Sequence, residues 1–207
     1  MRLFRPFFLA RLIYPDALFR IKTNKNEVCL TFDDGPDPGS TPGILEILGS
    51  HQVKAVFFCS GTQIEKYPEL SGLITSNGHI TGNHGFLHLR GWKTGAEQYI
   101  ENAYMAAGFT SSGLFRPPYG SLSPFQYFKL KKSFKIVFWD LMPYDFDPVF
   151  GKERSLGILK AKMRPGSVIV LHDKPASTVL SFLEEFLDYA EGKGYRFVFP
   201  GLSGKEQ

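Results

Sequence analysis

The stretch VCLTFDDGP, residues 28–36, runs from an apolar segment directly into two adjacent carboxylates and a Gly-Pro turn. A short apolar run bounded by a turn signal predicts a buried strand that opens into a turn at Asp33 and Asp34. Comparable runs recur along the 207 residues and alternate with longer stretches of helical spacing. Repeated strand–helix units predict parallel strands joined by right-handed crossovers, and therefore an α/β domain.

The expected strands include runs that are apolar throughout, which is typical of strands buried on both faces. They span residues 28–32, 55–59, 79–82, 114–116, 135–140, 168–172 and 196–199. The expected helices span residues 42–50, 68–77, 96–107, 124–132, 155–163 and 179–192. Seven such units in one chain of this size predict a barrel or a barrel-like sheet, with a doubly wound open sheet as the alternative.

Reactive side chains follow the carboxyl ends of these strands, where α/β barrels assemble their active sites. In chain order they are Asp33, Asp34, His84, His88, Arg116, Asp140, Asp145 and His172. This common position predicts that they lie on one face of the domain.

The two adjacent carboxylates crowd one strand end, and such crowding raises the pKa of one of them unless a cation intervenes. A metal beside one carboxylate, with the other left as a base, resolves that conflict. For this motif alone, turn-forming aspartates that cap the following helix are an equally good interpretation.

The sequence His84-Gly-Phe-Leu-His88 places two imidazoles four residues apart. On a helical turn they would share one face and reach one ion. With Asp34 as an oxygen donor, the set becomes two histidines and one carboxylate with an open position. That pattern is typical of catalytic rather than structural metal sites, whereas a lone histidine is more often a hydrogen-bonded bystander.

Four further residues have chemistry suited to the same site. Arg116, before a rigid Pro-Pro turn, can pair with a carboxylate, and the backbone N–H groups after the turn can face an oxyanion. His172 ends a strand where an imidazole can act as a general acid. Asp140 and Asp145 can orient that imidazole or Arg116; an arginine that only closes the barrel mouth is the structural alternative.

The ordered motifs TFDDGP, HxxxH, RPPYG, an Asp-x4-Asp-aromatic segment and Leu-His resemble the polysaccharide deacetylase (NodB-homology) family over residues 27–200. The resemblance implies a single-domain distorted (β/α) barrel of about seven parallel strands. It also implies a divalent metal, usually Zn²⁺, with Co²⁺, Ni²⁺ or Mn²⁺ as alternatives. In that family Asp34, His84 and His88 would be the ligands, and Asp33 would be the general base.

The same resemblance implies the remaining roles. Arg116 would hold Asp33, Asp145 would orient Arg116 and the acid, and His172 would protonate the leaving group. The Tyr119 backbone N–H would face the oxyanion, and Leu171 would line the acetyl pocket. The substrate-binding residues would be Pro117, Tyr119, Phe146 and Leu171.

Two positions depart from the family pattern. Gly85 stands where Ser or Thr is usual after the first metal histidine, which removes a loop hydrogen bond. Phe146 stands where Trp is usual, which removes an indole N–H and some stacking area. Neither change touches a ligand, the base or the acid, so we expect an active enzyme.

The resemblance implies a metal-dependent hydrolase that removes acetyl groups from N-acetylated sugars and releases acetate. Chitooligosaccharide, peptidoglycan or a lipid-linked glycan are the expected substrates. An O-deacetylase of an acetylated glycan is the alternative within enzymes, and a non-catalytic carbohydrate-binding module is the alternative outside them.

The composition and the N-terminal sequence limit which partners and locations are expected. The formal net charge of +4 comes without a clustered basic stripe, so no nucleic-acid partner is expected. Residues 1–26 are expected to form an arm, docked on the catalytic domain of residues 27–207 or lying at a membrane surface. Pro6 and Arg11 interrupt any signal-peptide core, which favours a cytoplasmic or membrane-peripheral location. Cys29 and Cys59 are expected to be small buried hydrophobes.

Overall fold

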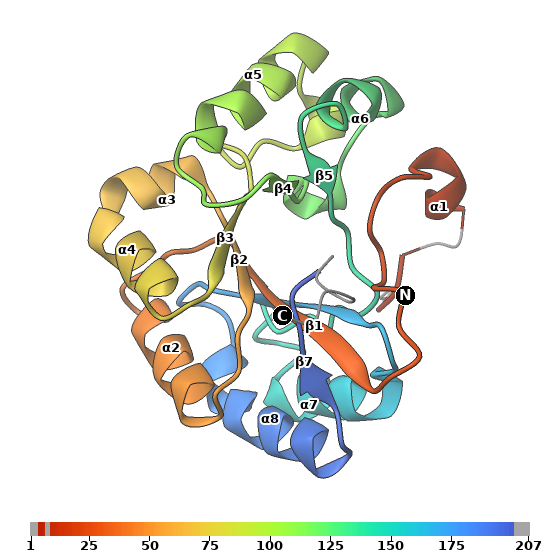
Figure 1. The fold of residues 1–207 in the computed structure, drawn as a ribbon. Helices are drawn as coiled ribbons and strands as arrows, with labels where there is room; N and C mark the ends of the chain where they lie inside the picture. Colours follow the sequence, from red (N-terminus) through yellow and green to blue (C-terminus); the bar gives the residue numbers. More distant parts are fainter. Residues whose placement is uncertain (1–3, 7–8, 201–207) are drawn as a thin grey trace, which may run out of the picture.

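The computed structural model describes residues 4–6 and 9–200, and within them a parallel α/β barrel (Figure 1). Its strands are β1 Glu27–Asp33, β2 Val56–Cys59, β3 Ile80–Asn83, β4 Leu114–Phe115, β5 Lys135–Ile136, β6 Val168–His172 and β7 Arg196–Phe197. Its α-helices are α1 Ala10–Ile13, α2 Thr41–Ser50, α3 Gly61–Lys66, α4 Pro68–Ser76, α5 Ala96–Ala107, α6 Pro124–Leu130, α7 Lys152–Lys162 and α8 Leu183–Gly192. The expected barrel is thus confirmed over the open sheet.

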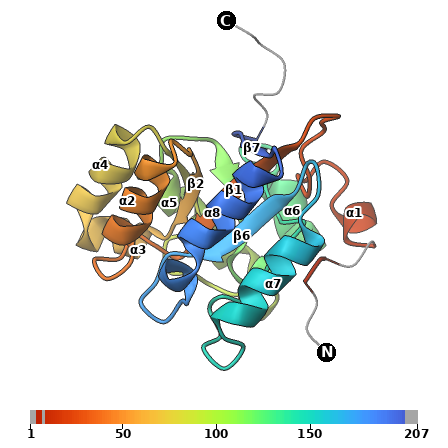
Figure 2. The same cartoon turned by 90° about the horizontal axis from the view of Figure 1, so that it is seen from below.

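The strand order is β5-β4-β3-β2-β1-β6, all parallel, and β7 pairs with the start of β1. The helices cover the outside of this curved sheet, and α2, α8 and α7 lie next to one another over β1 and β6 (Figures 1 and 2). In the register, Asp33 lies opposite both Phe58 and His172. The carboxyl ends of β1, β2 and β6 therefore meet at one edge.

A segment near the N-terminus closes the barrel between β5 and β6. Leu18 bridges Val137 and Arg20 bridges Ser167, while Leu141 bridges Ile169. The side chains of Tyr14, Phe19 and Ile21 are buried in the cores that these contacts complete. Residues 14–21 therefore complete the barrel wall. Residues 1–3 and 7–8 of the expected arm, and 201–207 of the expected domain, lie outside the described residues.

Strand alternation separates the inside of the barrel from the helix-covered outside. On β1, Val28, Leu30 and Phe32 pack against the helices, whereas Cys29 lies in the inner cluster. Thr31 and Asp33 share the period of Cys29 and so face the inside. Both Cys29 and Cys59 are buried and unpaired with each other.

The fifth strand differs most from its predicted bounds, residues 135–140. Beyond Ile136 the backbone changes partners: the Phe138 amide donates to Leu18, and the Asp140 amide donates to Val168. The apolar sequence continues past Ile136, but the pairing of this strand with β4 ends there. The short helices α1 and α3 were not predicted, because four and six residues give too little apolar periodicity. No helix within the described residues is long and apolar enough to cross a membrane.

Candidate active site

A cavity of about 480 Å³ opens at the carboxyl edge of the sheet. Its lining includes Asp33, Asp34, His84, His88, His172, Tyr119, Phe146, Arg90, Lys174, Trp139 and Val170. The structure thus brings together side chains from β1, from β6 and from the loops after β1, β3, β4, β5 and β6.

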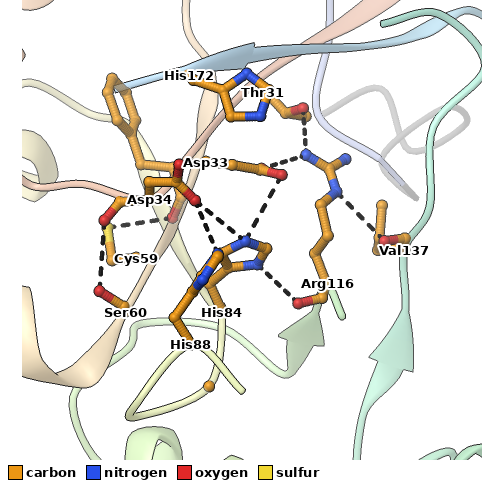
Figure 3. Close-up of polar contacts among 12 residues, drawn as sticks. Thr31, Asp33, Asp34, Cys59, Ser60, His84, His88, Arg116, Val137 and His172 are labelled. Carbon is orange, nitrogen blue, oxygen red and sulfur yellow. Dashed lines mark hydrogen bonds and ion pairs between the residues drawn. The ribbon is translucent and has the colours of Figure 1, made fainter. Parts of the chain in front are cut away.

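Asp33 is held at the end of β1 by a fully buried guanidinium (Figure 3). Arg116 Nη1 donates to Asp33 Oδ1 at 2.7 Å and to Thr31 Oγ1 at 2.6 Å. Its other nitrogens donate to the carbonyls of Val137 and Phe138, so the arginine cannot swing away. Asp33 Oδ2 faces the cavity, where it lies 3.9 Å from His84 Nε2. One oxygen is anchored and the other is free to accept a proton.

Asp34 turns toward the same cavity because its backbone is left-handed, with φ of 82°. Its Oδ1 lies 3.0 Å from His88 Nε2 and 3.6 Å from His84 Nε2. Burial alone would raise the pKa of Asp34, but the two neighbouring imidazoles hold that pKa well below its usual range. Asp34 is therefore an ionised oxygen donor at neutral pH.

The two histidines share a site without sharing a helix, so the expected helical turn was wrong. They lie on an irregular loop in which Gly85 and His88 have φ of 73° and 53°. Two amides hold the loop: Asn83 Oδ1 accepts from Gly85 N, and Asn102 Oδ1 accepts from Leu87 N. These asparagines replace helical hydrogen bonds as the device that aims both rings.

Gly85 fits this loop closely. A Cβ at this position would lie 2.8 Å from Asn102 Nδ2, on a backbone conformation that side chains rarely adopt. The Gly85 amide and carbonyl are both paired, to Asn83 and to the Gly61 amide. The loop therefore stays hydrogen-bonded at Gly85 without the Ser or Thr hydroxyl.

The residues Asp34, His84 and His88 fit a divalent metal. Their donor atoms all lie within 4.8 Å of one another. Two ligands of one tetrahedral zinc ion lie roughly 3.3 Å apart when metal–ligand bonds are about 2.0–2.1 Å, close to the separations of Asp34 Oδ1 from the two imidazoles. His84 Nδ1 donates to the Arg116 carbonyl at 2.8 Å, which leaves its Nε2 lone pair directed at the site.

His172 occupies the opposite side of the cavity and is held by Asp145. Asp145 Oδ1 accepts from His172 Nδ1 at 3.0 Å, and Oδ2 accepts from the His172 amide at 2.7 Å. Ser177 Oγ also donates to Oδ2 at 2.7 Å. Burial lowers the pKa of His172, but the carboxylates around it, Asp145 first and then Asp34 and Asp33, together raise it more, and the net pKa lies above the ordinary value. The ring is thus suited to carry a proton on Nε2.

Two expected roles for acids near His172 need correction. Asp145 contacts His172 and Ser177 in the described structure, and the bonds of Arg116 go to Asp33, Thr31 and two carbonyls instead. Asp140 does not reach the cavity: Arg164, Ser167 and Arg5 surround its carboxylate. The partner switch after Ile136 sends Asp140 to the start of β6, whereas His172 ends it.

The four expected substrate contacts divide into two pairs. Tyr119 and Phe146 line the cavity, and Tyr119 has a left-handed backbone with φ of 59°. Within the described residues the Tyr119 amide donates to no acceptor, as an oxyanion donor requires. Pro117 is buried and Leu171 packs in the helix-side core, so neither lines the cavity. Leu171 alternates with Val170 on β6, and Val170 lines the cavity in its place.

Lys174 and Asp173 were missed by the sequence reasoning. Lys174 Nζ donates to Asp34 Oδ2 at 2.8 Å, on the far side of that carboxylate from the imidazoles. Asp173 accepts hydrogen bonds from Ser40 and Thr41, and its amide donates to Asp33 O. The only available signal was their position directly after His172.

Comparisons with known proteins agree with this geometry. A family model described as polysaccharide deacetylase matches residues 20–131. The peptidoglycan-N-acetylglucosamine deacetylase of Bacillus cereus is 34% identical over 186 residues, covering 84% of this chain and 67% of that protein. The chitooligosaccharide deacetylase of Azorhizobium caulinodans is 34% identical over 166 residues, covering 74% and 77%.

A solved structure extends the match to the whole barrel. The Bc1960 peptidoglycan N-acetylglucosamine deacetylase, in complex with 4-naphthalen-1-yl-N-oxidanyl-benzamide, superimposes with a TM-score of 0.83 at 31% identity. The match covers 93% of this chain and 94% of that one. This chain belongs to the polysaccharide deacetylase family, and the relatives named here are hydrolases that remove acetyl groups from carbohydrates.

Proposed function

We propose that this protein removes acetyl groups from N-acetylated sugars of a poly- or oligosaccharide and releases acetate. One observation carries the proposal: Asp33 and His172, the proposed base and acid, lie level with each other beside three residues that could hold a metal ion. The relatives named above act on peptidoglycan and chitooligosaccharide, so glycans of these classes and lipid-linked glycans are the candidate substrates.

We propose Zn²⁺ as the metal, with Co²⁺, Ni²⁺ or Mn²⁺ as substitutes, held by Asp34, His84 and His88. Two nitrogen donors and one carboxylate oxygen make up a donor set that zinc accepts in hydrolases. An ion bound there supplies Lewis acidity toward the acetyl carbonyl and toward water.

The protein's own groups then move the protons. Asp33 Oδ2 accepts a proton from the water that attacks the acetyl carbon, while Arg116 keeps Oδ1 in place. The Tyr119 amide donates to the carbonyl oxygen as negative charge builds on it. His172 Nε2 gives its proton to the departing nitrogen, and the Asp145 carboxylate stabilises the charged imidazole before that transfer.

Metal analysis combined with acetate release tests this proposal. We expect about one divalent ion per chain and release of acetate from N-acetylated oligosaccharides, lost on chelation and restored by added Zn²⁺. Faster release from acetylxylan than from any N-acetylated glycan would favour the O-deacetylase alternative. Glycan binding without metal-dependent acetate release would favour the non-catalytic module.

We also propose peripheral membrane contact through the N-terminal arm, with a cytoplasmic or membrane-peripheral location. Helix α1 exposes Leu12 at 74%, with Leu9 and Ile13 also exposed and Arg11 between them. Such a mixture of apolar and basic side chains suits an anionic lipid surface. Co-sedimentation with anionic vesicles tests it: Leu12→Ser should reduce the bound fraction, and equal sedimentation of the two proteins would contradict the contact.

A further inference from the structure

The cavity has two walls built in the same order: an imidazole, an aromatic ring and a cation. On one wall the His88 ring lies 4.6 Å from the Tyr119 ring, and the Arg90 guanidinium lies 4.3 Å from the Tyr119 centroid. On the other wall His172 lies 4.6 Å from Phe146, and Lys174 Nζ lies 5.4 Å from the Phe146 centroid. All six side chains line the cavity.

The two cations differ in their partners. Lys174 is paired with Asp34 at 2.8 Å. Arg90 is exposed, and among the described residues no carboxylate lies within ion-pair distance of its guanidinium. Its described side-chain contact is the Tyr119 ring. Lys174 is therefore neutralised by the protein, whereas Arg90 is available to pair with a group on a ligand.

The charge balance around the cavity points the same way. The cavity-lining acids are Asp33 and Asp34, paired with Arg116 and Lys174. Arg5, a further lining cation, is paired with Asp140. Arg90 is thus the unmatched charge among the described lining residues, and a divalent ion at Asp34 would add positive charge to the cavity. Such a field attracts anions.

The position and planar shape of the Arg90 guanidinium also suit it to bind an anion. The planar guanidinium over an aromatic face loses little freedom on binding, and its remaining N–H groups form a fork that matches a carboxylate or a phosphate. Tyr119 connects it to the chemistry, because the amide of this residue faces the reacting carbonyl in the proposed reaction. An anion held by Arg90 therefore belongs to the acetylated sugar or its direct neighbour.

We propose that Arg90 is a specificity residue that binds an oxyanion of the substrate, and that the preferred substrates are acidic N-acetylated glycans. The oxyanion is a carboxylate or a phosphate on the reacting sugar or the adjacent one. This inference rests on the proposed deacetylase function and narrows its substrate class.

The test compares acetate release from three kinds of oligosaccharide. One is a neutral N-acetylglucosamine tetramer, one is a peptidoglycan tetrasaccharide with free lactyl carboxylates, and one is a neutral N-acetylglucosamine tetramer carrying a terminal phosphate. The same peptidoglycan tetrasaccharide with its carboxylates amidated gives a neutral match of equal shape. We expect kcat/KM to be higher on at least one acidic substrate than on its neutral counterpart, and the arm that responds identifies the oxyanion.

Replacing the guanidinium separates recognition from structure. Arg90→Gln should lower kcat/KM on the acidic substrate by roughly 10- to 100-fold, chiefly through KM, because a charge-assisted hydrogen bond is lost. On the neutral tetramer the change should be small. Arg90→Lys should restore part of the loss, since it keeps the charge but not the fork. Lys93→Gln removes an equal charge from an exposed position on the same loop outside the cavity and serves as the matched control.

Each result decides the matter. An equal loss on acidic and neutral substrates in Arg90→Gln would show that Arg90 only supports Tyr119, and would overturn the proposal. A neutral substrate preferred by the wild type would overturn it as well. If no substrate releases acetate, the deacetylase function fails, and calorimetric binding of the acidic and amidated tetrasaccharides to wild type and Arg90→Gln still decides whether Arg90 recognises an oxyanion.

Discussion

Asp140 and Asp145 lie five residues apart in one segment, and both are buried, yet they serve different regions. The Asp140 carboxylate bonds to Arg164 and Ser167 beside the start of β6, with Arg5 also paired to it. The Asp145 carboxylate bonds to His172 at the end of β6. The first region ties the N-terminal segment to the loop before β6, and the second lies at the cavity.

The difference lies in what each partner can do. Burial raises the pKa of Asp140, but hydrogen bonds from Arg164 and Ser167, together with the nearby Arg5, lower it by more, so the net pKa lies below its ordinary value. This acid therefore stays charged beside permanently charged guanidinium groups. No proton moves in such a cluster near neutral pH. Asp145 holds an imidazole whose other nitrogen can gain and lose a proton. A buried acid therefore contributes to catalysis through the chemistry of the group that it orients.

The largest effect is expected from the metal site, the part of the cavity that the Asp140 region lacks. His84→Ala removes one of three donors, so bound metal and acetate release should both fall to near background. Metal content by plasma mass spectrometry and acetate release measure the two losses together. Full metal content and full activity in this variant would remove His84 from the ligand set.

The next largest effect is expected for Asp33, which is paired with an arginine like Asp140 but keeps Oδ2 free toward the cavity. Asp33→Asn should lower kcat by roughly 10²–10⁴-fold, because the amide cannot accept the proton of water. Metal content should stay close to that of the wild type. Turnover retained at the wild-type rate would show that another group is the base.

A smaller effect is expected for Asp145, and it includes a pH signature. Asp145→Asn should lower kcat by about 10- to 100-fold, since the imidazole remains but is less well oriented and less basic. The acid form of His172 is lost as pH rises through its pKa, and Asp145 raises that pKa, so the alkaline limb of kcat against pH should move to lower pH. An unchanged limb would mean that His172 does not set it.

The same pair makes a stability prediction with a definite sign. Because the folded-state pKa of His172 is raised, the pair stabilises the fold below the unfolded value, about 6.5, and this contribution is lost as pH rises through the folded pKa. Thermal unfolding of Asp145→Asn and wild type should therefore differ more at pH 6 than at pH 9. A difference that grows with pH would contradict the assigned direction.

The smallest effect on activity is expected for Asp140, with the cost appearing in stability. Asp140→Asn leaves cations without their carboxylate, and the free energy of unfolding should fall by about 1–3 kcal/mol, less than for a fully buried pair because Arg164 is 44% exposed. The value of kcat should stay near that of the wild type. A loss of kcat comparable to that of Asp145→Asn, in a folded protein, would remove the distinction between the two regions.

Much of the site was predictable because it depends on local rules. Apolar runs that stop at Asp33 and His172 predict parallel strands whose carboxyl ends meet, and the structure places these residues opposite each other. Arg116 was expected to hold a carboxylate and does so. Strand periodicity could also have predicted that Leu171 faces away from the cavity, because it is adjacent to His172 on the strand and neighbouring side chains point to opposite faces. The family resemblance instead suggested that Leu171 lines the acetyl pocket.

The sequence by itself determined the parallel strand–helix units, the chemistry-bearing strand ends and the candidate metal donors, because apolar periodicity and residue type act locally. Only the tertiary structure decided which acid serves the cavity, how an irregular loop aims two imidazoles, and how residues 14–21 complete the wall. Each of these depends on partners far apart in the chain, such as Asp140 with Arg5 and Leu87 with Asn102. The left-handed backbone angles at Asp34 and Tyr119 likewise follow from packing, because residues other than glycine adopt positive φ only when their surroundings hold them there.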